Sequence, residues 1–141
     1  MNNEHSPVTP RSDNLLTSVG MDHVRLSYCY LNDGDLDAYC SLFAEQAVVR
    51  QPGRRPVTGR QELERVERAR RATRSVRHSI YEVFGSGRKV AALGLLTHRR
   101  HAGPAESDLP FVDVFTVADN GLLVDRTTFL FSPGSSLCSA D

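Results

Sequence analysis

The sequence predicts a single α+β domain in which an antiparallel sheet curls around helices. Helical periodicity dominates the first half of the chain, whereas from Ser75 onward apolar and polar residues alternate in segments separated by turns. Helices that precede an antiparallel sheet are typical of this class. The length of 141 residues, or 15.6 kDa, fits one domain with one core.

The two ends of the chain lack the apolar periodicity of a packed segment. Residues 1–20 and 132–141 are rich in Ser, Pro and other small or polar residues. We therefore expect 1–20 to be a disordered N-terminal tail, 21–131 to be the folded domain, and 132–141 to be a flexible C-terminal tail.

Three helices are expected in the first half of the domain. Apolar residues recur at helical spacing over 21–32, and Gly34 tolerates the positive φ angle that commonly ends a helix. Asp35 is a favourable N-cap for a second helix over 36–43. A third helix is expected over 60–72.

Strands are expected in the remaining segments. Three apolar residues at 47–49, followed by a Pro-Gly turn, indicate a short strand. The rest of the domain is expected to be a four-stranded antiparallel meander. Its strands are expected at 75–84, 89–100, 109–117 and 122–131, joined by a turn at 86–88, a loop at 102–108 and a tight turn at 119–121.

The charges balance, with 17 basic and 17 acidic residues, so no overall field draws the protein to nucleic acid or to an anionic membrane. Seven of the sixteen arginines nevertheless lie in 60–77, interleaved with glutamates three or four residues away. This pattern is typical of a solvated helix with weak ion pairs. The alternative is a surface that docks an acidic carrier protein. Nucleic-acid binding is not expected, because no aromatic residues are interleaved with the arginines.

Cysteine usage indicates a reducing compartment. Of the three cysteines, Cys29 and Cys40 lie in predicted helices and Cys138 lies in the C-terminal tail, so no disulfide framework is expected. The N-terminal residues lack the apolar segment of a secretory signal, and the longest apolar run, 90–96, is too short to span a bilayer. We expect a cytoplasmic protein. No metal-binding spacing is recognised, so neither a metal nor a cofactor is predicted.

Five short motifs occur in the order typical of one superfamily. They are an Asn-x-Gly-Asp-Leu joint (Asn32, Gly34, Asp35, Leu36), a Leu-Phe-Ala segment leading into an apolar strand (42–49), a Pro-x-x-Gly step (Pro56, Gly59), an Arg-His pair (Arg77, His78), and a closing hairpin (111–115 and 119–123). Over 22–131 the chain resembles the nuclear-transport-factor-2-like superfamily, particularly its SnoaL-like and ketosteroid-isomerase-like branches.

The resemblance implies a cone-shaped, curved antiparallel sheet wrapped around three N-terminal helices, the cystatin-like α+β barrel. A pocket is then expected between the concave face of the sheet and the helices. The superfamily contains isomerases, dehydratases, polyketide cyclases, epoxide hydrolases and noncatalytic modules, so the fold does not fix the function.

Strand alternation places one carboxylate on the inner face of the sheet. In the strand before the last turn, Phe111, Asp113 and Phe115 share a face. If the last turn has two residues, Asp113 lies opposite Thr128 and diagonal to Arg126. The carboxylate of Asp113 and the guanidinium of Arg126 are therefore expected side by side among apolar residues.

Two histidines are expected near the same patch. If loop 102–108 is a simple hairpin connection, Leu96 lies opposite Asp113, and His98 lies opposite Phe111. Alternation in the first meander strand gives His78 the same face as Val76, Ile80, Glu82 and Phe84.

Asp113 and His98 are the predicted catalytic residues. Burial raises the pKa of a carboxyl group and makes it a proton donor, whereas a close arginine has the opposite effect. By resemblance, Asp113 stands where ketosteroid isomerases keep a protonated Asp. The alternative is a structural ion pair between Asp113 and Arg126. A neutral His98 is suited to accept and return a proton, although the charged residues after it also fit a solvated strand end.

The chain departs from its best-understood relatives at their catalytic positions. Gln51 stands where ketosteroid isomerases have a general base, and an amide cannot take up that proton. Ser27 stands in place of their oxyanion Tyr, with Tyr28 next to it. Thr127-Thr128 replaces the Arg-Asp pair of limonene-type epoxide hydrolases. Steroid isomerisation by the known mechanism is therefore not expected.

The residues predict a small cofactor-independent enzyme for acid/base-assisted cyclisation, isomerisation or dehydration of a partly apolar, oxygenated molecule, as in polyketide-type pathways. Replacing Asp113 by Asn is expected to abolish turnover and to leave the melting temperature nearly unchanged. Substrate contacts are expected from Arg126, Thr128, Tyr28, His78, Gln51, Leu96, Phe111, Phe115 and Leu130.

The alternative function is a noncatalytic ligand-binding or dimeric accessory module. In either case Val112, Val114 and Thr116 give the sheet a second apolar face that needs cover. The resemblance implies that a second copy of the chain covers this convex face, so a homodimer is expected.

Overall fold

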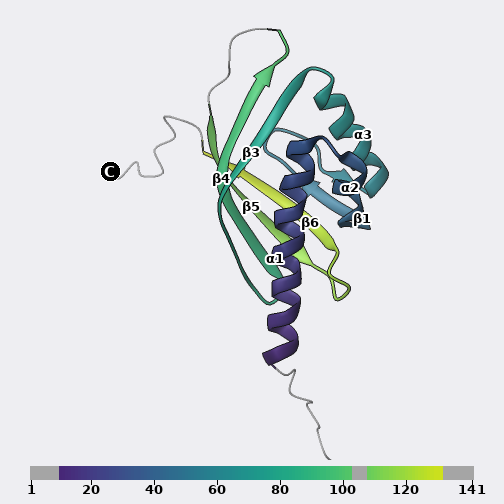
Figure 1. Ribbon diagram of the computed structural model, residues 1–141. Coiled ribbons are helices and arrows are strands. Elements are labelled where there is room, and N and C mark those ends of the chain that lie inside the picture. Colours follow the sequence, from purple (N-terminus) through teal and green to yellow (C-terminus); the bar gives the residue numbers. More distant parts are fainter. Residues whose placement is uncertain (1–9, 103–107, 132–141) are drawn as a thin grey trace, which may run out of the picture.

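The computed structural model describes residues 10–102 and 108–131 and has the predicted α+β architecture (Figure 1). Its elements are α1 (Pro10–Asp33), α2 (Leu36–Ser41), β1 (Phe43–Arg50), β2 (Val57–Thr58), α3 (Arg60–Arg71), β3 (Arg74–Ser86), β4 (Lys89–Arg100), β5 (Leu109–Val117) and β6 (Leu123–Leu130). The predicted bounds of the strands β4 and β5 are confirmed.

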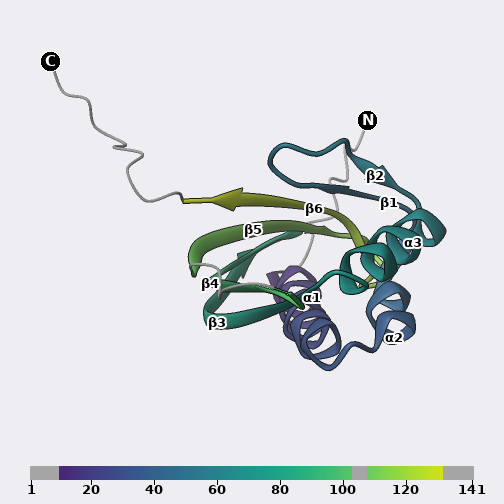
Figure 2. The same ribbon diagram turned by 90° about the horizontal axis from the view of Figure 1, so that it is seen from above.

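The strands form one curved sheet in the order β2-β1-β6-β5-β4-β3. The strands from β3 to β6 make the predicted antiparallel meander, but β1 pairs with β6 in parallel, so the sheet is mixed. Figure 2 shows the sheet curling around α1, with α2 and α3 beside α1 on the inner side. The fold matches the cone-shaped α+β form that the resemblance implies.

The helix α1 begins eleven residues before the predicted start at residue 21. The prediction of a tail over 1–20 is therefore wrong for residues 10–20, and residues 1–9 and 132–141 lie outside the described part. The Thr17 hydroxyl donates to the carbonyl oxygen of Gly87 at 2.7 Å. Gly20 lies so close to β5 that a Cβ atom there would come within 2.6 Å of Val117 Cγ2. Packing against the sheet, which local composition does not reveal, supports this part of the helix.

The joint between the first two helices follows the sequence motif. Gly34 has a φ angle of 77°, and the side chain of Asp35 accepts a hydrogen bond from Ala38 N. Asp35 is thus the predicted N-cap of α2. This helix ends at Ser41, two residues before its predicted end at residue 43, because the chain enters β1 at Phe43. The strand β1 is longer than the predicted 47–49, and the short strand β2 was not predicted.

The register between β4 and β5 differs from the prediction. Leu96 pairs with Leu109, and Ala92 lies opposite Asp113, which is a shift of four residues. The prediction assumed a symmetric hairpin. Instead, the last residues of β4 continue alongside β3, where His98 pairs with Val76. Because the shift is an even number, the inner and outer faces of the strand are unchanged.

A bulge in β3 corrects another prediction about faces. The register with β4 shifts between Ile80 and Glu82, so alternation is interrupted at Tyr81. Val83 is consequently buried, whereas Glu82 and Phe84 are exposed and do not share the face of His78. The sequence pattern contained no signal for the extra residue.

Candidate functional site

A cavity of about 460 Å³ lies between the inner face of the sheet and the helices. It is at the end of the sheet where β1, β4 and β6 end and β3 and β5 begin. Its apolar lining consists of Leu31, Pro52, Val76, Leu96, Leu109 and Leu130. Its polar and charged lining consists of Gln51, Arg54, Glu67, Arg70, Arg71, Arg74, His78, His98, Arg126 and Thr128. Cavities of this size hold small organic molecules.

A buried ion pair lies under this cavity. The Asp113 side chain is fully buried and that of Arg126 is 2% exposed. Arg126 donates from Nη2 at 2.7 Å and from Nε at 3.1 Å to Asp113 Oδ2. Tyr28 also donates to Oδ2, at 2.7 Å, and the Thr128 hydroxyl donates to Oδ1 at 2.5 Å. Both oxygens of Asp113 are thus satisfied by protein groups, and the residue does not line the cavity.

Arg126 keeps its charge despite burial. Burial is the largest single effect and lowers the pKa of the guanidinium, but Asp113, Tyr39 and Tyr28 together outweigh it and raise the pKa well above its ordinary value. Arg126 Nη1 donates to the Tyr39 hydroxyl at 2.9 Å. Burial, reinforced by the Asp113 charge, also raises the pKa of Tyr28 well above its ordinary value. A fixed cation therefore contacts the cavity from below, held in place by neutral phenols and one carboxylate.

His78 is a neutral imidazole beside this cation. Burial, followed by the repulsion of Arg126, lowers its pKa from 6.5 to about 3. Arg126 Nη2 lies 3.4 Å from His78 Nε2, and because arginine only donates, Nε2 is the acceptor. The proton of the neutral ring is then on Nδ1, a buried atom with no hydrogen-bond partner among the described residues.

The predicted site residues divide into two layers. Those that line the cavity are His78, His98, Gln51, Arg126, Thr128, Leu96 and Leu130. Those that lie beneath it are Asp113, Tyr28, Phe111 and Phe115, all of which are buried. The Tyr28 ring packs on both phenylalanine rings at centroid distances of 6.1 and 6.2 Å. Asp113, Tyr28, Phe111 and Phe115 were expected to contact the substrate, but they are not among the described residues that line the cavity.

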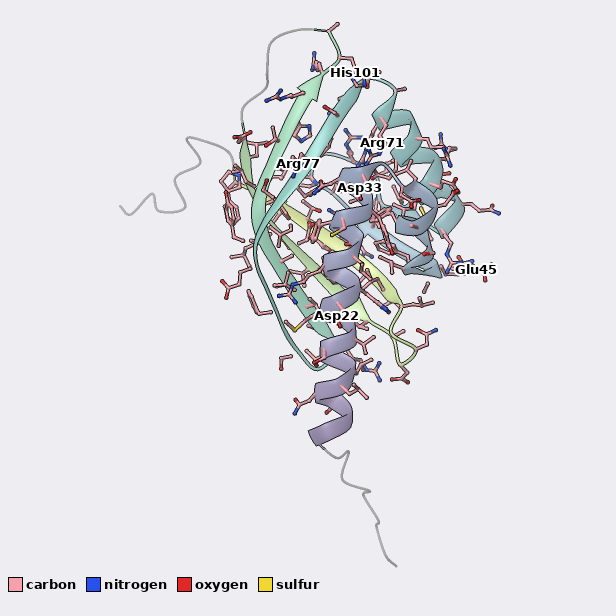
Figure 3. The ribbon with its side chains drawn as sticks, in the orientation of Figure 1. Asp22, Asp33, Glu45, Arg71, Arg77 and His101 are labelled. Carbon is pink, nitrogen blue, oxygen red and sulfur yellow. The ribbon has the colours of Figure 1, made fainter. Side chains whose placement is uncertain are left out.

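Sequence reasoning missed the basic end of the cavity. Arg70 and Arg71 at the end of α3 and Arg74 at the start of β3 line it, with Glu67 and Arg54. Figure 3 shows Arg71 near Asp33, at the end of α1. A signal was present, since Leu63, Glu67, Arg70 and Arg71 recur at helical spacing. The buried face of α3 thus continues from an apolar residue into charged ones.

The exposed side of α3 agrees with the prediction of a solvated helix. Arg65 pairs with Glu62 at 2.5 Å, and Arg68 pairs with Glu64 at 2.6 Å. Such exposed pairs contribute little to stability.

The described residues contain neither a metal-binding cluster nor a membrane-spanning helix. No cluster of three or more His, Cys, Asp or Glu side chains in 10–102 and 108–131 could hold a metal ion. No helix in the same ranges is long and apolar enough to cross a membrane. The cysteines Cys29 and Cys40, both in helices as predicted, are free thiols.

A curved sheet around a long helix, with a cavity at one end, defines the nuclear-transport-factor-2-like class of folds. A model of the SnoaL-like domain matches residues 24–126, so the chain belongs to the SnoaL-like domain family. No curated protein matches the sequence.

Solved structures give the same fold at low identity. A candidate polyketide cyclase from Xanthomonas campestris is 20% identical, with a TM-score of 0.72 over 80% of this chain and 90% of that one. An LEH-like epoxide hydrolase of M. tuberculosis is 16% identical, with a TM-score of 0.73 over 82% of this chain and 84% of that one. The epoxide hydrolase/cyclase-like enzyme SalBIII, of pyran ring formation in the polyether salinomycin, is 20% identical, with a TM-score of 0.71 over 85% and 94%. At these identities the likeness establishes the fold alone.

Proposed function

We propose that the chain is a cofactor-independent enzyme for acid/base-assisted cyclisation, isomerisation or dehydration of a partly apolar, oxygenated small molecule. The position of Arg126 carries the proposal, since this cation lines the cavity beside two histidines and is almost fully buried. A fixed positive charge in a poorly hydrated site stabilises an oxyanion or enolate as it forms. Three solved neighbours with the same fold are named as cyclases or epoxide hydrolases.

Arg126 is the proposed oxyanion-binding residue. Its hydrogen bonds to Asp113, Tyr39 and His78 use four of its five N–H groups and leave one on Nη1 for a substrate carbonyl oxygen. The Thr128 hydroxyl donates to Asp113, so its oxygen is available to accept from a substrate hydroxyl. Asp113 acts as a positioning residue in this proposal and not as the acid expected from the sequence.

His98 is the proposed acid/base. It removes a proton from the carbon next to the substrate carbonyl, and the electron pair of that C–H bond moves to the oxygen, where Arg126 stabilises the enolate. In cyclisation, the enolate carbon attacks an internal carbonyl, whose oxygen takes the proton back from His98. In isomerisation, His98 returns the proton to a different carbon of a conjugated dienolate. In dehydration, the enolate expels a hydroxyl group from the β carbon, and that group leaves as water with the His98 proton.

Glu67 is the second candidate for the base. It is the carboxylate among the described lining residues, and it pairs with Arg70 at 3.2 Å. His98→Gln and Glu67→Gln therefore separate the two assignments.

A noncatalytic ligand-binding module is the alternative function. Gln51 lines the cavity where related isomerases have their base, and a neutral amide is suited to hydrogen-bond a bound ligand without reacting. The proposal does not extend to docking an acidic carrier protein, because Arg65 and Arg68 are already paired with carboxylates. We also propose a homodimer and a reducing, cytoplasmic location, consistent with the free thiols of Cys29 and Cys40.

Exchange of carbon-bound protons tests the enzyme proposal. The exchange of the C2 protons of α-tetralone and of a panel of related ketones with D2O is followed by NMR. We expect the protein to accelerate exchange, and His98→Gln and Thr128→Val to lower the rate at least about tenfold. His23→Gln is the matched control, because His23 bonds to Gly121 at the other end of the sheet. Ketone binding without faster exchange would support the noncatalytic module.

A further inference from the structure

The charges that line the cavity do not balance. Among the described residues, five arginines line it, at positions 54, 70, 71, 74 and 126, against one carboxylate, that of Glu67. Asp113 beneath Arg126 neutralises one of them, and Glu67 neutralises Arg70. No carboxylate among the described residues pairs with the other three, which are Arg54, Arg71 and Arg74. The described part of the cavity lining therefore has an excess of positive charge although the whole chain is neutral.

The backbone fixes the position of two of these arginines. Arg71 ends α3 and donates from Nη2 to the carbonyl oxygen of Leu31 in α1, so its guanidinium is held at the cavity. Arg74 begins β3 only three residues later. Both side chains are half-buried. Two guanidiniums from adjoining elements are thus presented to one end of the cavity.

Two buried donors at this end have no acceptor among the described residues. Nε of Arg70 and Nε of Arg71 are buried and have no hydrogen-bond partner within the described ranges. A buried donor without an acceptor is unfavourable, so these two donors favour a ligand or water that supplies an acceptor. Arginine presents its donors in a planar fork that fits the paired oxygens of a carboxylate or phosphate.

The lowered pKa of Arg70 also indicates that an anion is favourable at this end of the cavity. Burial lowers its pKa, and although Glu67 acts in the opposite direction, the neighbouring charges of Arg54 and Arg126 lower the pKa further. Like charges gathered in a poorly solvated region repel one another. An anion placed among them would remove this repulsion.

We propose that the ligand of this cavity is an anion, with a carboxylate or phosphate group bound by Arg71 and Arg74 at the basic end. The apolar body of the ligand lies along Leu96, Leu109 and Leu130, and its reacting carbonyl lies at Arg126. This assignment deepens the proposed function and rests on it for the location of the substrate. It identifies the substrate class as an apolar acid, in which Arg126 contacts the reacting oxygen and the other arginines contact a second, permanently charged group.

Binding of a matched pair of probes tests the proposal. The affinities of 2-naphthoate and of the neutral isostere 2-naphthamide are measured by calorimetry at low salt, and then at high salt, which weakens charge pairing. We expect the carboxylate to bind at least about tenfold more tightly, and the difference to shrink at high salt. Inorganic phosphate is titrated alone and as a competitor, which separates recognition of any oxyanion from recognition of an apolar acid.

Variants locate the effect. Arg74→Gln is expected to weaken naphthoate binding about tenfold and to leave naphthamide binding unchanged. Arg71→Gln is expected to do the same. Because it also loses the bond to Leu31, its melting temperature is measured alongside. Arg65→Gln, on the exposed face of α3, is the matched control and should bind both probes as the wild type does.

The outcomes distinguish this proposal from the proposed enzyme function. Equal affinities for the two probes, no binding of naphthoate, or a preference that survives in both Arg74→Gln and Arg71→Gln would overturn the anion assignment even if ketone exchange is observed. Conversely, charge-selective binding without any exchange activity would uphold the anion assignment and contradict the enzyme proposal.

Discussion

The side chain of Asn32 bonds to both backbone polar groups of His78. Asn32 Nδ2 donates to the carbonyl oxygen of His78 at 2.8 Å, and His78 N donates to Asn32 Oδ1 at 2.8 Å. The strand β3 is at the edge of the sheet, so these groups have no partner strand on that side. Asn32 therefore takes the place of a neighbouring strand and fixes the histidine beside Arg126.

Removing this clamp should destabilise the fold and loosen the site. We expect Asn32→Ala to lower the free energy of unfolding by about 1–3 kcal/mol, because two partly buried backbone groups lose their partner. Urea denaturation measures the change, and hydrogen exchange at the His78 amide should become faster. Asn32→Asp keeps the acceptor but loses the donor, so its effect should be smaller. An alanine variant as stable as the wild type would contradict the assignment.

Asp113→Asn should destabilise the protein strongly. The sequence alone predicts a nearly unchanged melting temperature, but the structure places Asp113 as the partner of a buried cation. Removing one partner of a buried ion pair typically costs about 3–5 kcal/mol, because the other charge is left uncompensated. Urea denaturation at neutral pH measures the loss.

A double variant separates the charge from the shape of Asp113. Adding Arg126→Met to Asp113→Asn removes the stranded charge, so the double variant should recover part of the stability lost in Asp113→Asn. If the double variant is no more stable than Asp113→Asn, the stranded charge of Arg126 is not the source of the loss.

The stability of the protein should fall between neutral and mildly acidic pH because of His78. In the unfolded chain this residue takes up a proton below its ordinary pKa of 6.5, whereas in the fold its pKa is about 3. The unfolded state thus binds more protons in this window, and stability decreases as the pH falls, by up to about 1.4 kcal/mol per pH unit. The free energy of unfolding is measured by urea denaturation at several pH values. We expect it to change less with pH in His78→Gln than in the wild type. NMR signals of the His78 ring that titrate near neutral pH would contradict the prediction.

The outer face of the sheet should form a dimer interface. Phe84 and Phe129 are 51% and 52% exposed on strands β3 and β6, with the half-buried Val112 and Val114 between them on β5. We expect light scattering to give the mass of a dimer and Phe129→Glu to reduce it to that of a monomer. Leu15→Glu on α1, which changes an equally apolar residue that is 67% exposed, should leave the mass unchanged.

Local patterns predicted the site where short connections fix the register. The tight turn before β6 places Asp113 opposite Thr128, as alternation and turn length predict. The connection between β4 and β5 is longer, so its two sides need not be equal, and the predicted pairing of Leu96 was wrong by four residues. The parallel pairing of β1 with β6 joins distant segments, and nothing in either segment alone indicates it.

The sequence pattern also does not show how deeply a side chain is buried. Alternation gives the face of a strand on which Asp113 lies, but not whether Arg126 and Thr128 extend over it. The arginines at the end of α3 have the composition of a solvated helix, and only their position beside α1 makes them part of the cavity. Composition does not distinguish these two environments.

The residues beneath the cavity and the residues that line it differ in how well they should tolerate substitution. Asp113, Tyr28 and Tyr39 hold Arg126 from beneath and do not line the cavity, so changing any of them should disturb the fold. Arg54 and Arg74 come from a turn and a strand end, where replacement disturbs little. Substitutions at Arg54 and Arg74 alone could therefore change which ligand binds, while the buried cation of Arg126 stays the same.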